Sequence, residues 1–425
     1  MSNQRQAAEH GSQGGAESSR EQFPALTGIR AIAAYLVFLH HYVSSAIAHE
    51  LYIGVSIFFV LSGYLIAYKY AGSAQLSWTW LRGFWWNRFA RIYPLYGLLA
   101  AATLLVLREQ SVWSWVVNLT VLGSPIEMYQ FVHRVALDES MAGLRFTSMP
   151  QCWSLFVELC FYGTAPVLFV AARKSLLYPL AGMAAVLSVA MLGLQFLSGT
   201  PGLVGAARYL ALYTLPGRFF EFFVGICLAR WHVVWGASEE ARRGLPIRTV
   251  GGLAGIVAAT LGLYGLEGPE YLFGQYHPVG IAINSILLPP AIGVLFYGLI
   301  RERSWLRWCL ATPCMRFLGN VSYAFYLVHM GPVGGALLRA TGDACQTLGG
   351  VEFGTAAQYH LAQPWGAFVA LNGAAILLYL LIELPAHHWL RRPAGGGTQA
   401  PAPAPPPVST SRPTYLTMSG DRNAA

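Results

Sequence analysis

Long apolar stretches, separated by short polar connections, recur along most of this chain. Each stretch is close to the roughly 20 residues that an α-helix needs to cross the hydrocarbon core of a bilayer. Backbone polar groups in lipid must be satisfied internally, which favours helices. The pattern therefore predicts an all-α, polytopic transmembrane helix bundle of about ten spans, near residues 26–43, 51–69, 92–107, 153–171, 177–196, 212–229, 248–266, 278–300, 317–338 and 366–384.

Three segments do not follow this pattern. Residues 1–22 are polar and rich in Gly, Ser and Gln, and residues 393–425 begin with a Pro/Ala-rich run, so both are predicted to be disordered tails. One membrane-embedded domain is expected between them, over residues 23–392. The apolar segment Val112–Gly123 is too short to span, and we interpret it as re-entrant or interfacial.

The composition supports a membrane protein. Hydrophobic residues make up 55% of the 425 residues and charged residues only 11%, whereas an average soluble domain is about 25% charged. A net charge of +8 would also be typical of a nucleic-acid-binding protein. The positions of the charges decide between these classes.

Basic residues concentrate on one side of the predicted bundle. With the N-terminus placed in the cytoplasm, the outer connections carry only five basic residues, which are Arg108, Arg134, Arg145, Arg208 and Arg339. The positive-inside rule then predicts both termini in the cytoplasm. Because this asymmetry accounts for most of the positive charge, no nucleic-acid partner is expected. The inner side carries sixteen basic residues: Lys69, Arg82, Arg88, Arg91, Arg173, Lys174, Arg230, Arg242, Arg243, Arg248, Arg301, Arg303, Arg307, Arg316, Arg391 and Arg392.

The six cysteines do not indicate a metal centre. No CxxC motif and no metal-ligand spacing occurs, so no metal site is expected. Only Cys152 and Cys345 lie near the predicted outer face, which leaves a bridge between them open.

Ionisable residues within predicted spans are candidates for function, because a charge in lipid is costly unless it faces a cavity or a partner. The first span holds Arg30 near its cytoplasmic end, and His40 and His41 near its outer end. Arg30 and His41 are eleven residues apart, which is about 16 Å and close to three helical turns, so they share a face. An arginine reaching lipid phosphate and a structural histidine would explain each residue alone. The pair on one face favours a functional site.

Further polar residues lie in or beside the next spans. In the second span, Ser62 is a candidate hydroxyl donor, and Gly63 favours close helix packing. Arg88 and Arg91 lie three residues apart at the cytoplasmic side. Two guanidiniums one turn apart suit a phosphate group, although topological anchoring explains them almost as well.

The fourth span contributes Glu158, at a depth similar to that of His41. A carboxylate beside an imidazole fixes its tautomer and raises its basicity, which a general base requires. A structural Glu–His pair would look identical in sequence. In the sixth span, Arg218 and Glu221 have the i, i+3 spacing that an internal ion pair and a functional pair explain equally well.

The ninth span places hydroxyls and an imidazole toward mid-membrane, on Ser322, Tyr323, Tyr326 and His329. With these segments in view, the chain resembles the acyltransferase-3 family of integral membrane acyltransferases. The resemblance covers about residues 23–392. It rests on FPALTGIRAIAAYLVFLHHY with its Arg-x10-His spacing, FFVLSGYLI, RFARIYP, WSLFVELCFY, the Arg218–Gly225 stretch, SYAFYLVH and IELP, in that order. Thr27 stands where many members carry Asp.

The resemblance implies transfer of an acyl group, often acetyl from its coenzyme A thioester, to a hydroxyl. The acceptors are usually cell-envelope polysaccharides or glycolipids and sometimes small molecules such as macrolides. The family's essential arginine and histidine carry over to Arg30 and His41. The family also implies a multi-pass protein of the bacterial inner membrane, in contact with lipid. Many members carry a fused extracytoplasmic domain, so we expect either an extracytoplasmic partner protein or direct access to the acceptor.

The two lines of inference combine into one hypothesis. Arg30, with Arg88 and Arg91, holds acyl-CoA at the cytoplasmic mouth. His41 is the general base and Glu158 orients it. Hydroxyls of Ser62, Tyr323 or Tyr326 stabilise the oxyanion. His40 points about 100° away from His41 and is the weaker candidate. An acyl-imidazole intermediate on His41 is compatible with the same geometry.

Two other classes of protein remain as alternatives. In a transporter or flippase of an envelope glycan or lipid intermediate, Arg30, Glu158, Arg218 and Glu221 would bind substrate or relay protons. No internal repeat supports that reading. In a non-catalytic envelope scaffold, replacement of Arg30 or His41 would have no effect.

Overall fold

The structure, a computed structural model, describes residues 23–133, 149–198, 203–235, 244–271 and 273–390. Both predicted tails lie outside these residues, as do six of the predicted topological anchors. These six are Arg134, Arg145, Arg242, Arg243, Arg391 and Arg392.

The described residues form helices and connections, with no strand among them, which confirms the all-α fold class. The regular elements in chain order are α2 (Pro24–Tyr42), α3 (Ala46–His49), η1 (Glu50–Ile53), α4 (Gly54–Tyr70), α5 (Trp78–Val106), α6 (Val112–Leu119), α7 (Gly123–His133), α8 (Cys152–Lys174), α9 (Leu177–Ser198), α10 (Leu203–Tyr213), α11 (Leu215–Trp235), α12 (Ile247–Tyr264), η4 (Gly274–Tyr276), α13 (Pro278–Ala282), η5 (Ile283–Leu287), α14 (Leu288–Arg301), α15 (Trp305–Leu310), α16 (Pro313–Val328), α17 (Gly331–Ala362), α18 (Pro364–Leu378), η6 (Tyr379–Glu383) and α19 (Leu384–Leu390).

Seven helices of the described chain are long and apolar enough to cross a membrane, or eight if one bent pair counts as a single span. The predicted count of ten and the cytoplasmic placement of both termini therefore stay predictions. Three of the predicted spans fall outside the set of seven: 26–43, 177–196 and the bent segment 317–338. Residues 26–43 form α2, and residues 177–196 form α9, whose apolar part, Leu177–Gly193, is shorter than the others.

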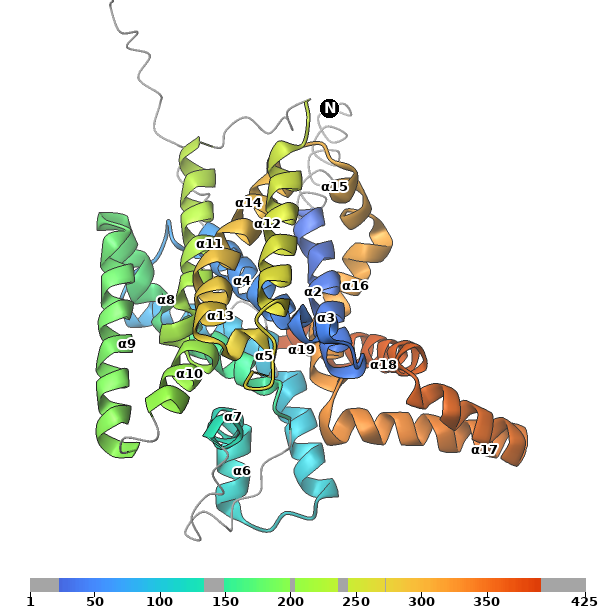
Figure 1. Ribbon diagram of the computed structural model, residues 1–425. Helices are drawn as coiled ribbons and strands as arrows, with labels where there is room; N and C mark the ends of the chain where they lie inside the picture. Colours follow the sequence, from blue (N-terminus) through green and yellow to red (C-terminus); the bar gives the residue numbers. More distant parts are fainter. Residues whose placement is uncertain (1–22, 134–148, 199–202, 236–243, 272, 391–425) are drawn as a thin grey trace, which may run out of the picture.

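The predicted span at residues 317–338 is divided between two helices. Helices α16 and α17 meet at an angle of 101°. Met330 is extended, Gly331 has a φ of 82°, and Pro332 follows. Since a positive φ favours glycine and proline begins a helix more easily than it continues one, these residues end α16 at Val328 and begin α17 at Gly331. Figure 1 shows α17 leaving the bundle sideways.

Close crossings hold the central helices together. A Cβ atom on Gly63 of α4 would lie 2.2 Å from the carbonyl oxygen of Phe222, and one on Gly225 of α11 would lie 2.3 Å from that of Val60. The prediction of close packing at Gly63 is thereby confirmed. Small residues at such crossings let two backbones approach. The crossing places the middle of α4, including Ser62, at the centre of the bundle.

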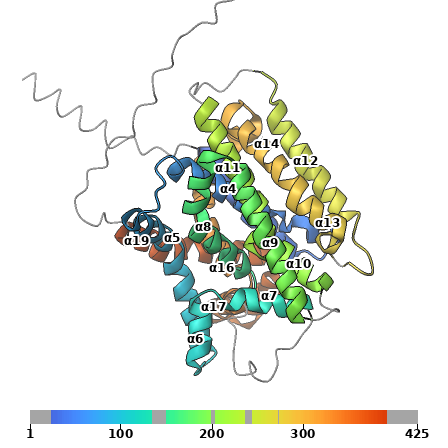
Figure 2. The same ribbon diagram turned by 90° about the vertical axis from the view of Figure 1, so that its left-hand side faces the viewer.

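The helix that carries Arg30 and His41 is held in the same way. A Cβ atom on Gly28 of α2 would lie 2.0 Å from the carbonyl oxygen of Leu310, and one on Gly319 of α16 would lie 1.9 Å from that of Thr27. Helix α2 therefore packs along α16. Helices α12 and α14 pack along each other at one side of the bundle (Figure 2).

Arg218 and Glu221 form the internal ion pair that their spacing allowed. Their side chains are 2.7 Å apart and almost completely buried. Arg218 also donates a hydrogen bond to Ser56 of α4 at 3.0 Å, and its guanidinium lies over the rings of Phe59 and Trp153. The pair thus ties α11 to α4 and α8.

The cysteines contribute no crosslink. All six thiols are free, Cys152 and Cys345 included, so the bridge left open by the sequence does not form.

Glu302 caps the beginning of α12 from the end of α14. Its carboxylate accepts hydrogen bonds from the backbone amides of Arg248 and Thr249, at 3.0 and 2.8 Å, and from the Thr249 hydroxyl at 2.9 Å. Burial alone would raise the pKa of Glu302, but these hydrogen bonds and the nearby Arg248 guanidinium hold it below its usual range. A negative charge at this helix end also complements the helix dipole.

Glu302→Gln is expected to lower the free energy of unfolding by about 1–2 kcal/mol at neutral pH, as the loss of a charged helix cap does. Because the folded-state pKa is depressed, the stabilisation is present above the ordinary glutamate pKa and is lost as the pH falls through the folded-state value. Thermal unfolding of the purified proteins from pH 8 downward measures this. The difference in stability between the wild type and Glu302→Gln should narrow below a pH of about 4. A difference that is constant at every pH would assign the effect to packing.

Candidate functional site

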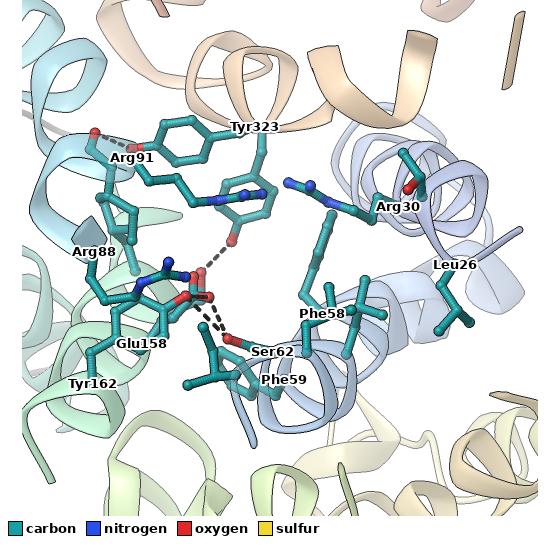
Figure 3. A pocket seen from close by; sticks show the side chains of 18 of the residues that line it. Leu26, Arg30, Phe58, Phe59, Ser62, Arg88, Arg91, Glu158, Tyr162 and Tyr323 are labelled. Atoms are coloured by element: carbon teal, nitrogen blue, oxygen red, sulfur yellow. Dashed lines mark hydrogen bonds between the residues drawn. The ribbon is translucent and has the colours of Figure 1, made fainter. Parts of the chain in front are cut away.

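A cavity of about 660 Å³ opens between α2, α4, α5, α8 and α16. It contains six of the seven predicted site residues, drawn from five helices (Figure 3). His41 is not in its lining. The six are Arg30, Ser62, Arg88, Arg91, Glu158 and Tyr326.

Positive charge dominates the lining of this cavity. Arg30 and Arg91 extend toward one another from α2 and α5 in Figure 3, and neither makes a hydrogen bond or an ion pair with another described residue within normal contact distance. Arg88 is buried, donates to the Tyr70 hydroxyl at 3.2 Å and lies over the rings of Tyr70 and Tyr162. Converging guanidiniums without fixed partners are suited to bind an anion with several oxygens.

A smaller cavity of about 110 Å³ adjoins the first, and Arg30 and Arg91 line both. Its far side is formed by the π-helical turn η6 and the start of α19, which bring Glu383 to the two guanidiniums. Single π-helical turns occur frequently at functional sites. The arginine pair therefore forms the wall between two spaces.

Glu158 is placed differently from the prediction. It does not pair with His41: it accepts a hydrogen bond from the Ser62 hydroxyl at 2.7 Å and a short one from the Tyr162 hydroxyl. Glu158 lies nearly two turns into α8, level with the middle of α4, whereas His41 lies at the end of α2. Depth estimated from span boundaries did not resolve this offset. Tyr162, one turn after Glu158, was not singled out from the sequence.

The predicted oxyanion donors are already engaged. Ser62 donates to Glu158, and Tyr323 donates to the carbonyl oxygen of Ile92 at 2.8 Å. The Tyr326 hydroxyl contacts Ser154 at 2.7 Å and donates to the Gln151 carbonyl oxygen at 3.0 Å. Each would stabilise an oxyanion only by exchanging a present partner for the substrate.

His41 meets a second histidine instead of a carboxylate. Its Nδ1 lies 2.8 Å from the Val37 carbonyl oxygen and 3.4 Å from Nε2 of His329. A carbonyl oxygen only accepts hydrogen bonds, so Nδ1 of His41 carries the proton and Nε2 keeps its lone pair. Nδ1 of His329 lies 2.7 Å from the Tyr326 carbonyl oxygen, which by the same argument leaves Nε2 of His329 as an acceptor.

The two histidines differ in exposure. His329 is fully buried, whereas His41 is exposed at the surface. Since His329 follows Tyr326 by three residues, its ring connects the end of the cavity to His41: the Tyr326 and His329 rings are 5.4 Å apart and the His329 and His41 rings 5.1 Å. His329 of the ninth predicted span thus takes the place beside His41 that was predicted for Glu158. The Gly331–Pro332 break is the sequence signal that places it.

Along the bundle, the site has a clear order. Phe23, Tyr68 and Lys69 lie where α2 begins and α4 ends; the arginines and the Ser62–Glu158 pair follow, and Tyr326 lies at the opposite end of the cavity. No group of three or more His, Cys, Asp or Glu side chains in the described residues could hold a metal ion.

Comparison with known proteins gives a family match over most of the chain. A family described as an acyltransferase domain matches residues 23–384. No solved structure matches.

Three characterised or named relatives illustrate the range of similar proteins. The chain is 29% identical over 420 residues to the acyltransferase MdmB of Streptomyces mycarofaciens, covering 90% of this chain and 96% of that protein. It is 27% identical to the putative peptidoglycan O-acetyltransferase YrhL of Bacillus subtilis, over 72% of this chain and 48% of that protein. It is 25% identical to the peptidoglycan O-acetyltransferase OatA of Listeria monocytogenes, over 73% of this chain and 49% of that protein. The chain thus corresponds to about half the length of the two peptidoglycan enzymes.

Proposed function

Because this chain belongs to the acyltransferase-3 family and is a multi-pass membrane acyltransferase, we propose that it moves an acyl group, acetyl above all, from coenzyme A to a hydroxyl of a carbohydrate or glycolipid of the cell envelope. The membrane is the bacterial inner membrane, and the donor enters from the cytoplasm. His41 is the general base of the reaction.

The observation that carries this proposal is the pair of guanidiniums, Arg30 and Arg91, that converge on the cavity without a hydrogen-bonded or ion-paired partner among the described residues. Like charges repel, so the pair needs negative charge nearby: Glu383 faces it from the smaller cavity, and an anion bound in the larger cavity would balance it further. The phosphates of coenzyme A supply such an anion, and Arg88 adds a third charge. The pantetheine arm then extends past Ser62 toward Tyr326, so that the thioester approaches the His329–His41 pair.

The proposed chemistry uses the bare Nε2 of His41. This nitrogen takes the proton from the acceptor hydroxyl as the hydroxyl oxygen attacks the thioester carbonyl carbon. An ester C–O bond forms, the C–S bond breaks, and the imidazolium returns the proton to the leaving sulfur. His329 accepts the Nδ1 proton of His41 as a hydrogen bond and so holds the ring in the required tautomer. The exposed position of His41 lets the acceptor approach from the side opposite the arginines.

The names of two relatives support the proposed class of acceptor. Both are named as acting on peptidoglycan, and a glycan hydroxyl is accordingly the proposed acceptor here. The match over 96% of MdmB, which is named as an acyltransferase, supports acyl transfer as the reaction. The transporter alternative is disfavoured because Arg218 and Glu221, two of its four candidate residues, bind each other away from the cavity.

Incubation of purified protein with radiolabelled acetyl-CoA and envelope fractions tests the function. The wild type should label an acceptor through a bond that mild alkali releases, as an ester requires, and His41→Gln should not. Equal labelling by both proteins would reject the role of His41. Translocation of a lipid-linked glycan without any acyl transfer would reject the enzymatic proposal in favour of a flippase.

A further inference from the structure

An aromatic group lies at the end of the cavity where α2 begins. We call Phe23, Tyr64, Tyr68 and His232 the aromatic cluster. Phe23 contacts the other three rings edge-on, with centroids 5.1 to 5.6 Å apart. Tyr68 also lies 5.3 Å from His232. None of the residues assigned above to donor or acceptor chemistry belongs to this cluster.

Two members of the cluster support the other two. Tyr64 is fully buried, and its hydroxyl forms a hydrogen bond of 2.7 Å with Nδ1 of His232 on α11. Phe23 and Tyr68 are only partly buried, and they line the cavity, whereas Tyr64 and His232 do not. The cluster therefore presents two rings to the cavity on a base that is fixed by α4 and α11.

Charge accompanies these rings. Lys69 follows Tyr68, is exposed, and lines the same part of the cavity. Arg30 lies seven residues after Phe23, or about 10 Å farther along α2. From the end of the cavity inward, a ligand therefore meets aromatic faces, one ammonium group and then the guanidiniums. A lipid tail would not require the charges, and a simple phosphate would not require the rings.

We propose that Phe23 and Tyr68 form a subsite for the nucleobase of the donor, in which the adenine ring of coenzyme A packs against them and Lys69 contacts the phosphate on the ribose. Aromatic side chains bind bases through their π-faces, with cationic neighbours adding to the attraction. This inference rests on the proposed function, since it needs a coenzyme A donor. It assigns the mouth of the cavity to the nucleotide and the interior to the pantetheine arm.

The test compares two ligands that differ in the nucleotide. Binding of coenzyme A and of pantetheine 4′-phosphate is measured on purified wild type and variants. Tyr68→Ala is expected to weaken coenzyme A binding about tenfold, the order of magnitude lost with one base–aromatic stack, and to leave pantetheine 4′-phosphate binding unchanged. Tyr68→Phe, which keeps the ring, should bind both ligands as the wild type does. Tyr178→Ala, an exposed tyrosine at the start of α9, is the matched control and should alter neither.

The outcomes separate the subsite from the function on which it rests. An equal loss for both ligands in Tyr68→Ala, with normal binding by Tyr68→Phe, would mean that the ring only holds the helices in place. Unchanged coenzyme A binding in Tyr68→Ala would contradict the nucleobase subsite, while coenzyme A would remain the proposed donor. If the wild type binds neither ligand, the coenzyme A donor itself fails, and the nucleobase subsite fails with it.

Discussion

His41→Gln is expected to lower kcat for acyl transfer about 10³-fold, within the range that a positioned general base contributes. Glutamine keeps the size and polarity of the side chain but has no basic nitrogen, so the acceptor hydroxyl would attack without losing its proton to the enzyme. The KM for acetyl-CoA should change little, because His41 is not in the lining of the cavity that holds the arginines. Steady-state kinetics with a soluble glycan fragment measure both constants.

The neighbouring residue provides the matched control. His40→Gln removes an imidazole from the same helical turn, and the rings of His40 and His41 are 4.6 Å apart. Among the described residues, however, only His41 is within hydrogen-bond distance of His329. We expect His40→Gln to retain activity. The kcat of His329→Gln should lie between those of His41→Gln and His40→Gln. Its pH–rate profile should also shift, because the substitution alters the hydrogen bond that orients His41. A larger loss from His40→Gln than from His41→Gln would move the base to the other histidine.

Arg30→Gln and Arg91→Gln are each expected to raise the KM for acetyl-CoA about 10- to 100-fold, as the loss of hydrogen bonds from a charged group implies. The effect on kcat should be smaller, because neither guanidinium reaches the histidine pair. Arg82→Gln, which removes an exposed charge from the same helix as Arg91, should leave KM unchanged. Direct binding of radiolabelled acetyl-CoA checks that KM reports affinity.

The thermal stability of Arg30→Gln and Arg91→Gln, measured with and without donor, tests the same proposal in a second way. Removing either guanidinium relieves repulsion between the two arginines and also removes attraction to Glu383, so thermal stability without donor should change little. Donor-induced stabilisation should fall at the same time. A variant that instead loses stability without donor, with normal KM, would show that Arg30 or Arg91 serves the fold.

The sequence predicted those features that depend on one helix at a time. The eleven-residue spacing of Arg30 and His41 placed them on one helix, and the i, i+3 spacing of Arg218 and Glu221 was compatible with the ion pair that forms. Arg30, Arg88, Arg91, Ser62 and Glu158 were all predicted to belong to one site, and all five line one cavity, although Glu158 had been expected beside His41. These inferences need only helical periodicity and the known length of a membrane-spanning helix.

Features that depend on how one helix shifts along another were not predicted. The position of α8 along α4 and α2 decides whether Glu158 meets Ser62 or His41, and helical periodicity within one segment does not contain it. The bend after His329 likewise changes the count of spans, although Gly331 and Pro332 signal it locally.

The break after His329 has an electrostatic consequence for the proposed reaction. Helix α2 ends at Tyr42 and α16 ends at Val328, so two helix C-termini converge on the His41–His329 pair. The carbonyl end of a helix carries partial negative charge, worth about 0.3–1 kcal/mol to a nearby cation. When His41 takes the acceptor proton, the positive charge therefore arises between two negative dipole ends. The backbone supplies part of the stabilisation that a buried carboxylate provides in many acid–base sites, without placing a fixed anion beside the incoming thioester.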